Sequence, residues 1–141
     1  MIGRARTLSG VVLAIAMASA APDTARAQAP LTRDQVLGAL AGASPAHPAD
    51  FTGQDLSGLD LAGVDFKRAN LTKARLVRTN LTRAQLNSAT LTDAVATQAD
   101  LTDADVAGAD LAGAILKGIR GRDRLRGLDK ALHVDQAIFN D

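Results

Sequence analysis

Large apolar residues recur at every fifth position between residues 49 and 118, with no insertion anywhere in the run. Counted in fives from Ala49, the third position is Leu or Phe in twelve of the fourteen units, and Ala96 and Val106 occupy the other two. The first position is Ala in ten units, and the second is Asp or Asn in nine. A fixed short period of this kind is typical of a repeat architecture, in which each unit packs against its neighbours.

A period of five residues fits neither a regular helix nor a regular strand. A helix needs apolar positions three or four residues apart, and a half-buried strand needs them two apart. A chain that turns a corner every five residues does keep its third-position side chains together, with the small first-position Ala beside them. The pattern therefore predicts a solenoid.

The units resemble the pentapeptide repeat family, whose consensus is A-(D/N)-L-(S/T)-x. Residues 69–73 (ANLTK) and 99–103 (ADLTD) match it fully, and the resemblance covers 70 of the 141 residues. It implies an all-β solenoid, a right-handed quadrilateral β-helix with four units, or twenty residues, in each coil. Fourteen units would then form about 3.5 coils.

Stacking every twentieth residue predicts which side chains lie above one another. One buried column becomes Leu56, Leu76, Ala96 and Leu116, and the small Ala96 predicts a void or an inward shift at its level. Opposite charges also stack, in three pairs: Lys73 with Asp93, Arg83 with Asp103, and Asp55 with Arg75. Because such pairs on adjacent strands help to fix register, we interpret the basic band at residues 67–83 as structural.

Residues 1–27 are predicted to be an export signal peptide. Two arginines precede an apolar run over residues 8–21, and Ala-Arg-Ala at 25–27 is a small-x-small cleavage site. Cleavage after Ala20 is the second possibility. The run is shorter than the ~20 residues of a membrane span, although an uncleaved anchor is the alternative. The mature protein is expected in the periplasm or outside the cell, with only the signal at the membrane.

Residues 28–48 are predicted to form an N-terminal helix cap and a linker. Thr32 and Gln35 have the spacing of a capping box at the start of a helix over residues 31–42. Its apolar stripe is Val36, Leu37 and Leu40. We expect this helix to lie over the open end of the solenoid, because terminal repeats need a cap.

Residues 119–141 are predicted to form an irregular C-terminal cap. Four arginines alternate within it: Arg120, Arg122, Arg124 and Arg126. If this segment is extended, all four side chains point the same way, because side chains alternate across a strand. The alternatives are an edge that discourages strand pairing and a patch for an anionic partner, which four Arg→Ser substitutions would test.

Composition argues against catalysis and against nucleic acid as a partner. Removing residues 1–27 takes away three of the 16 basic and one of the 15 acidic residues, which leaves a net charge of about −1. The chain has no Cys, Glu, Tyr or Trp, and its two histidines, His47 and His133, have no catalytic partner at useful spacing. We therefore expect no enzyme activity, no cofactor and no metal.

Two alternatives concern the acidic residues. Some pentapeptide repeat proteins mimic DNA and act on type II topoisomerases, and the resemblance would assign that acidic face to second-position carboxylates: Asp50, Asp55, Asp60, Asp65, Asp100, Asp105 and Asp110. Arg75 interrupts the stripe, export removes the target, and a hydrogen bond within each turn is a sufficient role for Asp or Asn there. The second alternative is a calcium site at Asp100, Asp103 and Asp105.

The sequence thus predicts an exported, non-enzymatic solenoid that serves as a structural or protein-interaction module in the bacterial envelope. Its partner would be a protein or an anionic envelope component. We expect a monomer or a weak dimer.

Overall fold

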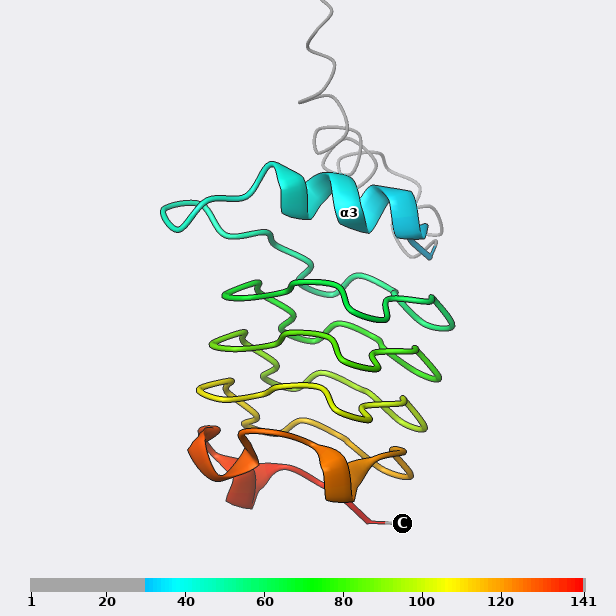
Figure 1. Cartoon of the computed structure of the whole chain (residues 1–141), viewed down its shortest axis with the longest axis vertical. Coiled ribbons are helices and arrows are strands. Elements are labelled where there is room, and N and C mark those ends of the chain that lie inside the picture. Colours follow the sequence, from blue (N-terminus) through cyan, green and yellow to red (C-terminus); the bar gives the residue numbers. More distant parts are fainter. Residues whose placement is uncertain (1–29, 141) are drawn as a thin grey trace, which may run out of the picture.

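The computed structural model describes residues 30–140 as stacked coils below a single helix (Figure 1). The predicted signal peptide over residues 1–27 lies outside the described residues. Within residues 30–140, no helix has the length and apolarity to cross a bilayer.

The coils are joined by parallel β-bridges between second-position residues. The partners are twenty residues apart from Asp50 with Asn70 as far as Asp100 with Arg120. Four units therefore make one coil, which confirms the predicted stacking. Each side of a coil contributes one isolated bridge, and residues 30–140 contain no longer strand.

Each corner is a tight turn that the five-residue unit supplies by itself. The carbonyl of Phe51 accepts the N–H of Gln54 at 2.9 Å, and the same bond recurs along the chain. All fourteen fifth positions have φ between 57° and 73°, as the third residue of a type II turn requires. Glycine accepts this φ freely, which explains Gly53, Gly58 and Gly63 in the first coil.

Second-position Asp and Asn residues complete these turns. In all nine, the side-chain Oδ1 accepts the backbone N–H two residues on, as in Asp50 with Thr52 at 3.0 Å and Asp110 with Ala112 at 3.1 Å. Such local bonds are the usual reason for Asp or Asn in turns. The predicted turn role is confirmed.

The core is a stack of third-position side chains with the first-position residues beside them. Leu56, Leu76, Ala96 and Leu116 are all at most 4% exposed. Thr79 is the buried polar residue at a first position, and its hydroxyl donates to the carbonyl of Leu56 at 2.8 Å. The void at Ala96 stays a prediction.

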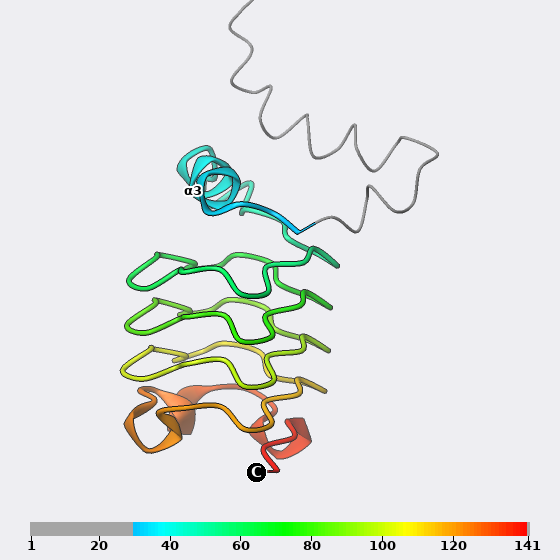
Figure 2. The same ribbon diagram turned by 90° about the vertical axis from the view of Figure 1, so that its right-hand side faces the viewer.

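Helix α3 (Arg33–Ala41) lies across the first coil (Figures 1 and 2). The predicted capping box between Thr32 and Gln35 is present. Val36 is fully buried, and the N–H of Leu31 donates to the carbonyl of Asp55 at 2.9 Å. Leu37 was expected in the apolar stripe, but its side chain is 37% exposed.

The irregularity predicted for the C-terminal segment is wrong, and its role as a cap stays a prediction. Pairing continues through three more bridges, Asp105 with Arg126, Asp110 with Leu132 and Ile115 with Ile138. Bridge positions from Arg120 onward are six residues apart, and a short 3₁₀ helix takes up the extra residue in each unit: η2 (Arg122–Arg124), η3 (Leu128–Lys130) and η4 (Val134–Gln136). The solenoid therefore extends one coil beyond the predicted 3.5.

The four arginines of this segment do not share one face, contrary to the prediction for an extended strand. Arg120 and Arg126 lie at bridge positions on adjacent sides, whereas Arg122 and Arg124 belong to η2. The Arg122 guanidinium lies 4.4 Å from the centre of the Phe139 ring. Arg124 binds Asp103 through two hydrogen bonds of 2.9 and 3.0 Å. These last two side chains tie the final units together.

Candidate functional site

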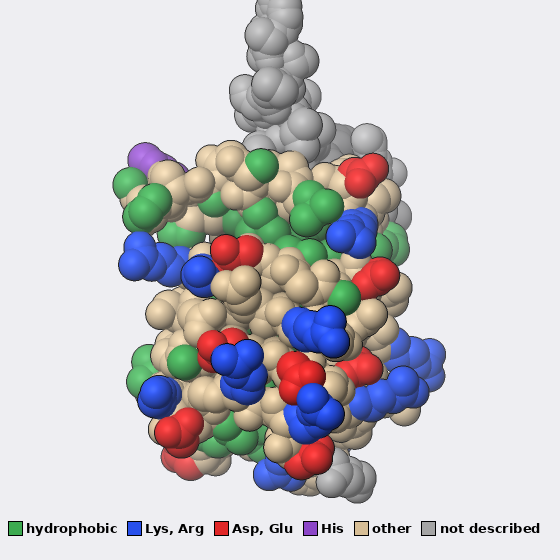
Figure 3. All heavy atoms as spheres, in the orientation of Figure 1, with side chains coloured by type: hydrophobic (Ala, Val, Ile, Leu, Met, Phe, Trp, Pro, Cys, Tyr) green, Lys and Arg blue, Asp and Glu red, His purple; other side chains and the backbone are tan. Residues whose placement is uncertain are grey.

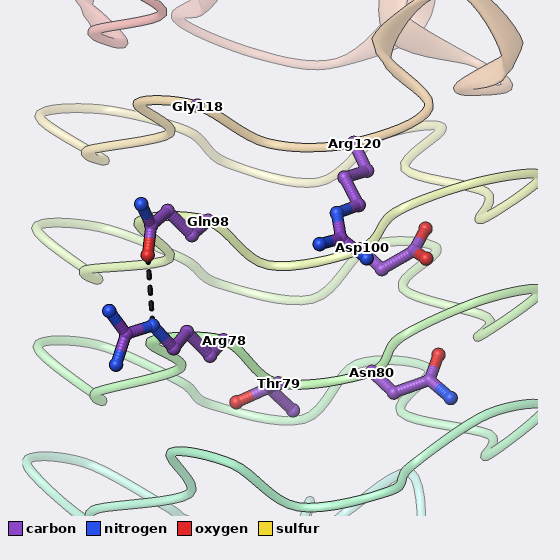
Figure 4. Close-up of a pocket in the computed structure, with 7 residues that line it drawn as sticks. All are labelled: Arg78, Thr79, Asn80, Gln98, Asp100, Gly118 and Arg120. Atoms are coloured by element: carbon purple, nitrogen blue, oxygen red, sulfur yellow. Dashed lines mark hydrogen bonds between the residues drawn. The ribbon is translucent and has the colours of Figure 1, made fainter.

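Two open grooves run along adjacent sides of the solenoid. The first groove, of about 460 Å³, is drawn in Figure 4 and is lined by Arg78, Thr79, Asn80, Gln98, Asp100, Gly118 and Arg120. The second groove, of about 420 Å³, is lined by Arg83, Ala84, Gln85, Asp103, Asp105 and Arg126. Each is the hollow between a column of corner residues and a column of second-position side chains.

The two grooves repeat one arrangement. Each has an arginine at the fifth position of the second coil, Arg78 or Arg83, and another at the bridge position of the fourth coil, Arg120 or Arg126. A second-position aspartate of the third coil, Asp100 or Asp105, also lines each groove. The duplication follows from the repeat, because equivalent positions on successive sides adopt the same backbone.

One corner residue makes the grooves electrostatically different. In the first groove, Arg78 Nε donates to the neutral Gln98 amide oxygen at 2.9 Å (Figure 4). The equivalent corner of the second groove is Asp103, which already binds Arg124. The first groove thus has two arginines against one carboxylate, and the second has two against two. Only the first has a net positive lining.

The aspartates in both grooves stay ionised at neutral pH. The pKa of Asp100 is lowered, chiefly by the hydrogen bond from the Thr102 hydroxyl, with a smaller contribution from Arg120. The pKa of Asp105 is lowered, chiefly by the Asn87 side chain. Because both carboxylates already accept turn hydrogen bonds, they contribute fixed negative charge within the grooves.

Comparison with known proteins agrees with this architecture. A family model for pentapeptide repeats matches residues 49–83 and 79–118. A solved pentapeptide repeat protein from the thylakoid lumen of Arabidopsis thaliana is 31% identical, with 72% of this chain and 69% of that one covered and a TM-score of 0.57. The chain belongs to the pentapeptide repeat family. Membership implies the right-handed quadrilateral β-helix.

Other comparisons add little to this assignment. A pentapeptide repeat protein from the cyanobacterium Cyanothece 51142 is 31% identical over 66% of this chain and 65% of that one, with a TM-score of 0.38. QnrB1, a plasmid-mediated fluoroquinolone resistance protein, is 20% identical over 64% and 65%, with a TM-score of 0.24. That likeness is too distant to transfer a role. No curated protein matches the chain.

The charges of this pentapeptide repeat chain are layered by coil. Residues 69–88 contain four basic and no acidic residues, whereas residues 89–108 contain four acidic and no basic residues.

The register that stacks Lys73 over Asp93 is as predicted, with the N–H of Lys73 bound to the carbonyl of Thr92. None of the three predicted charge pairs is within 4.0 Å among residues 30–140; the pairs formed are Lys67–Asp65, Arg124–Asp103 and His133–Asp110. Figure 3 shows the two signs interleaved on one face.

The four arginines predicted as one site lie at different places in the structure, and two of them share a groove with arginines that were not predicted. Arg120 lines the first groove and Arg126 the second, while Arg122 and Arg124 line neither. Sequence reasoning missed Arg78 and Arg83 as groove residues, because their stacking over the third coil suggested only a role in register. The sequence signal that could have found them is a second arginine about two coils further on, Arg120 for Arg78 and Arg126 for Arg83.

The hypothesis of a calcium site at Asp100, Asp103 and Asp105 finds no support in the geometry. Asp103 binds Arg124, and Asp100 and Asp105 each accept hydrogen bonds in their own turns on different sides. In the described part of the chain, no three carboxylates or histidines come together in a metal-binding group.

Acid sensitivity should begin only near pH 4. The pKa of Asp110 is lowered from 3.8, chiefly by His133, whose Nδ1 lies 2.8 Å from Oδ1. Asp100 and Asp105 are shifted in the same direction. Because a lowered pKa in the folded state favours the fold above the unfolded pKa, their contribution is complete above about pH 4 and is lost as pH falls through the folded values.

Denaturant unfolding between pH 2 and pH 7 measures this dependence. Asp110→Asn is the matched variant, because Asn70 and Asn80 already serve the same turn at the same position. We expect its stability to depend less on pH in the acid range than that of the parent. A loss of parent stability that is already under way at pH 6 would contradict the assignment.

Proposed function

We propose that this chain is an exported, non-enzymatic pentapeptide repeat protein that acts as a structural or protein-interaction module in the bacterial envelope. The observation that supports it is the way the solenoid uses its polar groups. All nine second-position Asp and Asn side chains bond within their turns, and what faces outward is a pair of open, arginine-lined grooves. Open polar surfaces of a rigid solenoid suit binding better than catalysis.

Export is supported by the signal-like residues 1–27, with their positive start, apolar run and cleavage motif. The Arabidopsis relative is itself a protein of the thylakoid lumen. The partner that we propose is a protein or an anionic envelope component, and the outward arginines are the residues that would contact it.

Action on a topoisomerase by DNA mimicry is the weaker proposal. Such mimicry needs a continuous acidic face, whereas the second coil carries Lys73, Arg75, Arg78 and Arg83 and no carboxylate. The second-position acidic side chains of the other coils are bonded within their own turns. Purified protein is therefore expected to leave DNA supercoiling by gyrase unchanged at micromolar concentration.

Cell fractionation tests the export proposal. The chain with a C-terminal tag should be recovered outside the cytoplasm and should be cleaved by protease added to cells with a permeabilised outer membrane. N-terminal sequencing should place the mature start after Ala27 or Ala20. A variant with Arg4→Asp and Arg6→Asp, which removes the positive start, serves as the control and should stay in the cytoplasm. Recovery of the unaltered, full-length chain in the cytoplasm would refute the proposal.

Affinity capture from envelope extract then tests the binding role. The wild-type chain should retain a partner that is released by salt, because screening weakens contacts between exposed charges. A variant with Arg120→Ser and Arg126→Ser, which keeps the contacts of Arg122 and Arg124 within the fold, should retain less of it. Equal retention by both chains would remove these arginines from the proposed surface.

A further inference from the structure

The two grooves differ in the charge of one corner residue, Gln98 or Asp103, and this difference affects which ligand each can bind. The inference rests on the proposed binding function. We propose that the first groove binds a ligand with two oxyanionic groups, one held by Arg78 and the other by Arg120. A small dicarboxylate and a segment of an acidic polymer both have this chemistry.

The arginines of the first groove have donors to spare. Arg78 uses Nε for Gln98, and within residues 30–140 its terminal Nη groups form no hydrogen bond to protein. The Arg120 side chain forms none in the same part of the chain. A guanidinium has five N–H donors in a planar fork that fits carboxylate and phosphate oxygens. Both side chains can therefore bind an oxyanion without breaking a contact of the fold.

Spacing favours two anionic groups rather than one. Arg78 belongs to the second coil and Arg120 to the fourth, so their backbones are two layers apart. At the usual separation of neighbouring strands, this is ~10 Å along the axis. Figure 4 shows the Arg120 side chain reaching from its own coil toward the next, so that its guanidinium lies at the level of Gln98 and Asp100, across the groove from Arg78. A ligand that engages both arginines must therefore span the groove from the corner column to the second-position column.

The lining between the arginines suits such a ligand. The Gln98 carbonyl oxygen accepts the Arg78 Nε–H, and in the described part of the chain its two amide N–H groups stay available as donors. Gly118 follows Gln98 in the same corner column and carries no side chain to fill the space. Asp100 repels anions at one point only, and its charge is partly offset by Arg120.

The second groove has two equivalent arginines, Arg83 and Arg126, but should not bind this ligand. Its corner residue is Asp103 where the first groove has Gln98. Asp103 is ion-paired to Arg124 at 2.9 Å and adds a second carboxylate to the groove that Arg83 and Arg126 line. The grooves are thus an internal pair that differs mainly in one charge, which makes a matched experiment possible.

Isothermal titration of the purified full chain with hexaglutamate, citrate and inorganic phosphate at low salt tests the proposal. Arg78→Gln with Arg120→Gln removes the proposed contacts. Arg83→Gln with Arg126→Gln removes two equivalent charges from the other groove. Gln98→Asp gives the first groove the charge pattern of the second, and aspartate already occupies this corner position at Asp93 and Asp103 with the same positive φ.

Hexaglutamate or citrate should bind the parent more tightly than phosphate, which offers one oxyanion. We expect affinity to fall at least about tenfold, or ~1.4 kcal/mol, in the first-groove pair and in Gln98→Asp, and by less than about twofold in the second-groove pair. Preference for citrate would identify a small ligand, and preference for hexaglutamate a polymer. Equal losses from both grooves, or no binding to the parent, would overturn the inference. Export and envelope capture are measured separately, so they can succeed where this fails.

Discussion

Gly127→Ala should detach the C-terminal coil from the coils that precede it. A Cβ at residue 127 would lie 2.6–2.8 Å from the backbone N, Cα and Cβ of Ala107. The segments around Ala107 and Gly127 cannot move apart without breaking the bridge between Asp105 and Arg126. We expect a loss of about 3 kcal/mol or more, as for other forced overlaps in packed structures.

Gly53→Ala is the matched control for this variant. Gly53 has a φ of 69°, close to the 76° of Gly127, but an added Cβ meets nothing within 4 Å. It should cost only the intrinsic strain of a left-handed residue, ~1 kcal/mol. Thermal unfolding gives the two stabilities, and hydrogen exchange should show protection lost over residues 119–138 in Gly127→Ala alone. Similar losses in both variants would mean that φ, and not the close approach of the coils, decides the effect.

Leu76→Ala should cost about 2–5 kcal/mol, the usual range for a buried leucine. Leu76 is 1% exposed, between Leu56 and Ala96 in its column. Ala96→Leu should act in the opposite direction and add ~1 kcal/mol, because it fills the predicted void. The double variant should be more stable than the two single changes in free energy predict when added, since the leucine at position 96 can occupy part of the space that Leu76→Ala leaves.

Ala94→Leu is the control for the void predicted at Ala96. Ala94 is similarly buried, at 1% exposure, but it lies at a first position, with Ala74 and Ala114 in the same column. It should lose stability by about 1–3 kcal/mol through overpacking. Urea unfolding of the four variants measures these free energies. A loss of stability in Ala96→Leu would show that the coil has already closed around Ala96.

The repeat itself could be predicted because its causes are local. A corner every five residues needs a side chain for the core, a small neighbour and a residue that bonds across the turn, and each of these is visible in a unit such as residues 99–103. The N-terminal helix was predicted for the same reason, since Thr32 and Gln35 bond within one turn.

The C-terminal coil was missed because its unit changes from five residues to six. Asp123, Asp129, Asp135 and Asp141 recur at that spacing, and Ile119 and Leu125 show the same period. The contrast between small and large inward residues is weaker there than in the main repeat. Each extra residue is absorbed by a 3₁₀ turn, so the pairing with the coil above, which holds the segment in register, appears only in three dimensions.

By itself the sequence determined the period, the stacking of every twentieth residue and the charge of each layer, because these follow from residue size and turn chemistry within five positions. The tertiary structure decided how the arginines are shared out. It binds Arg124 to Asp103 and leaves Arg78 and Arg120 facing one groove. Those relations join residues 21 and 42 positions apart, and their geometry depends on coil spacing and on where the six-residue units begin, which no local pattern specifies.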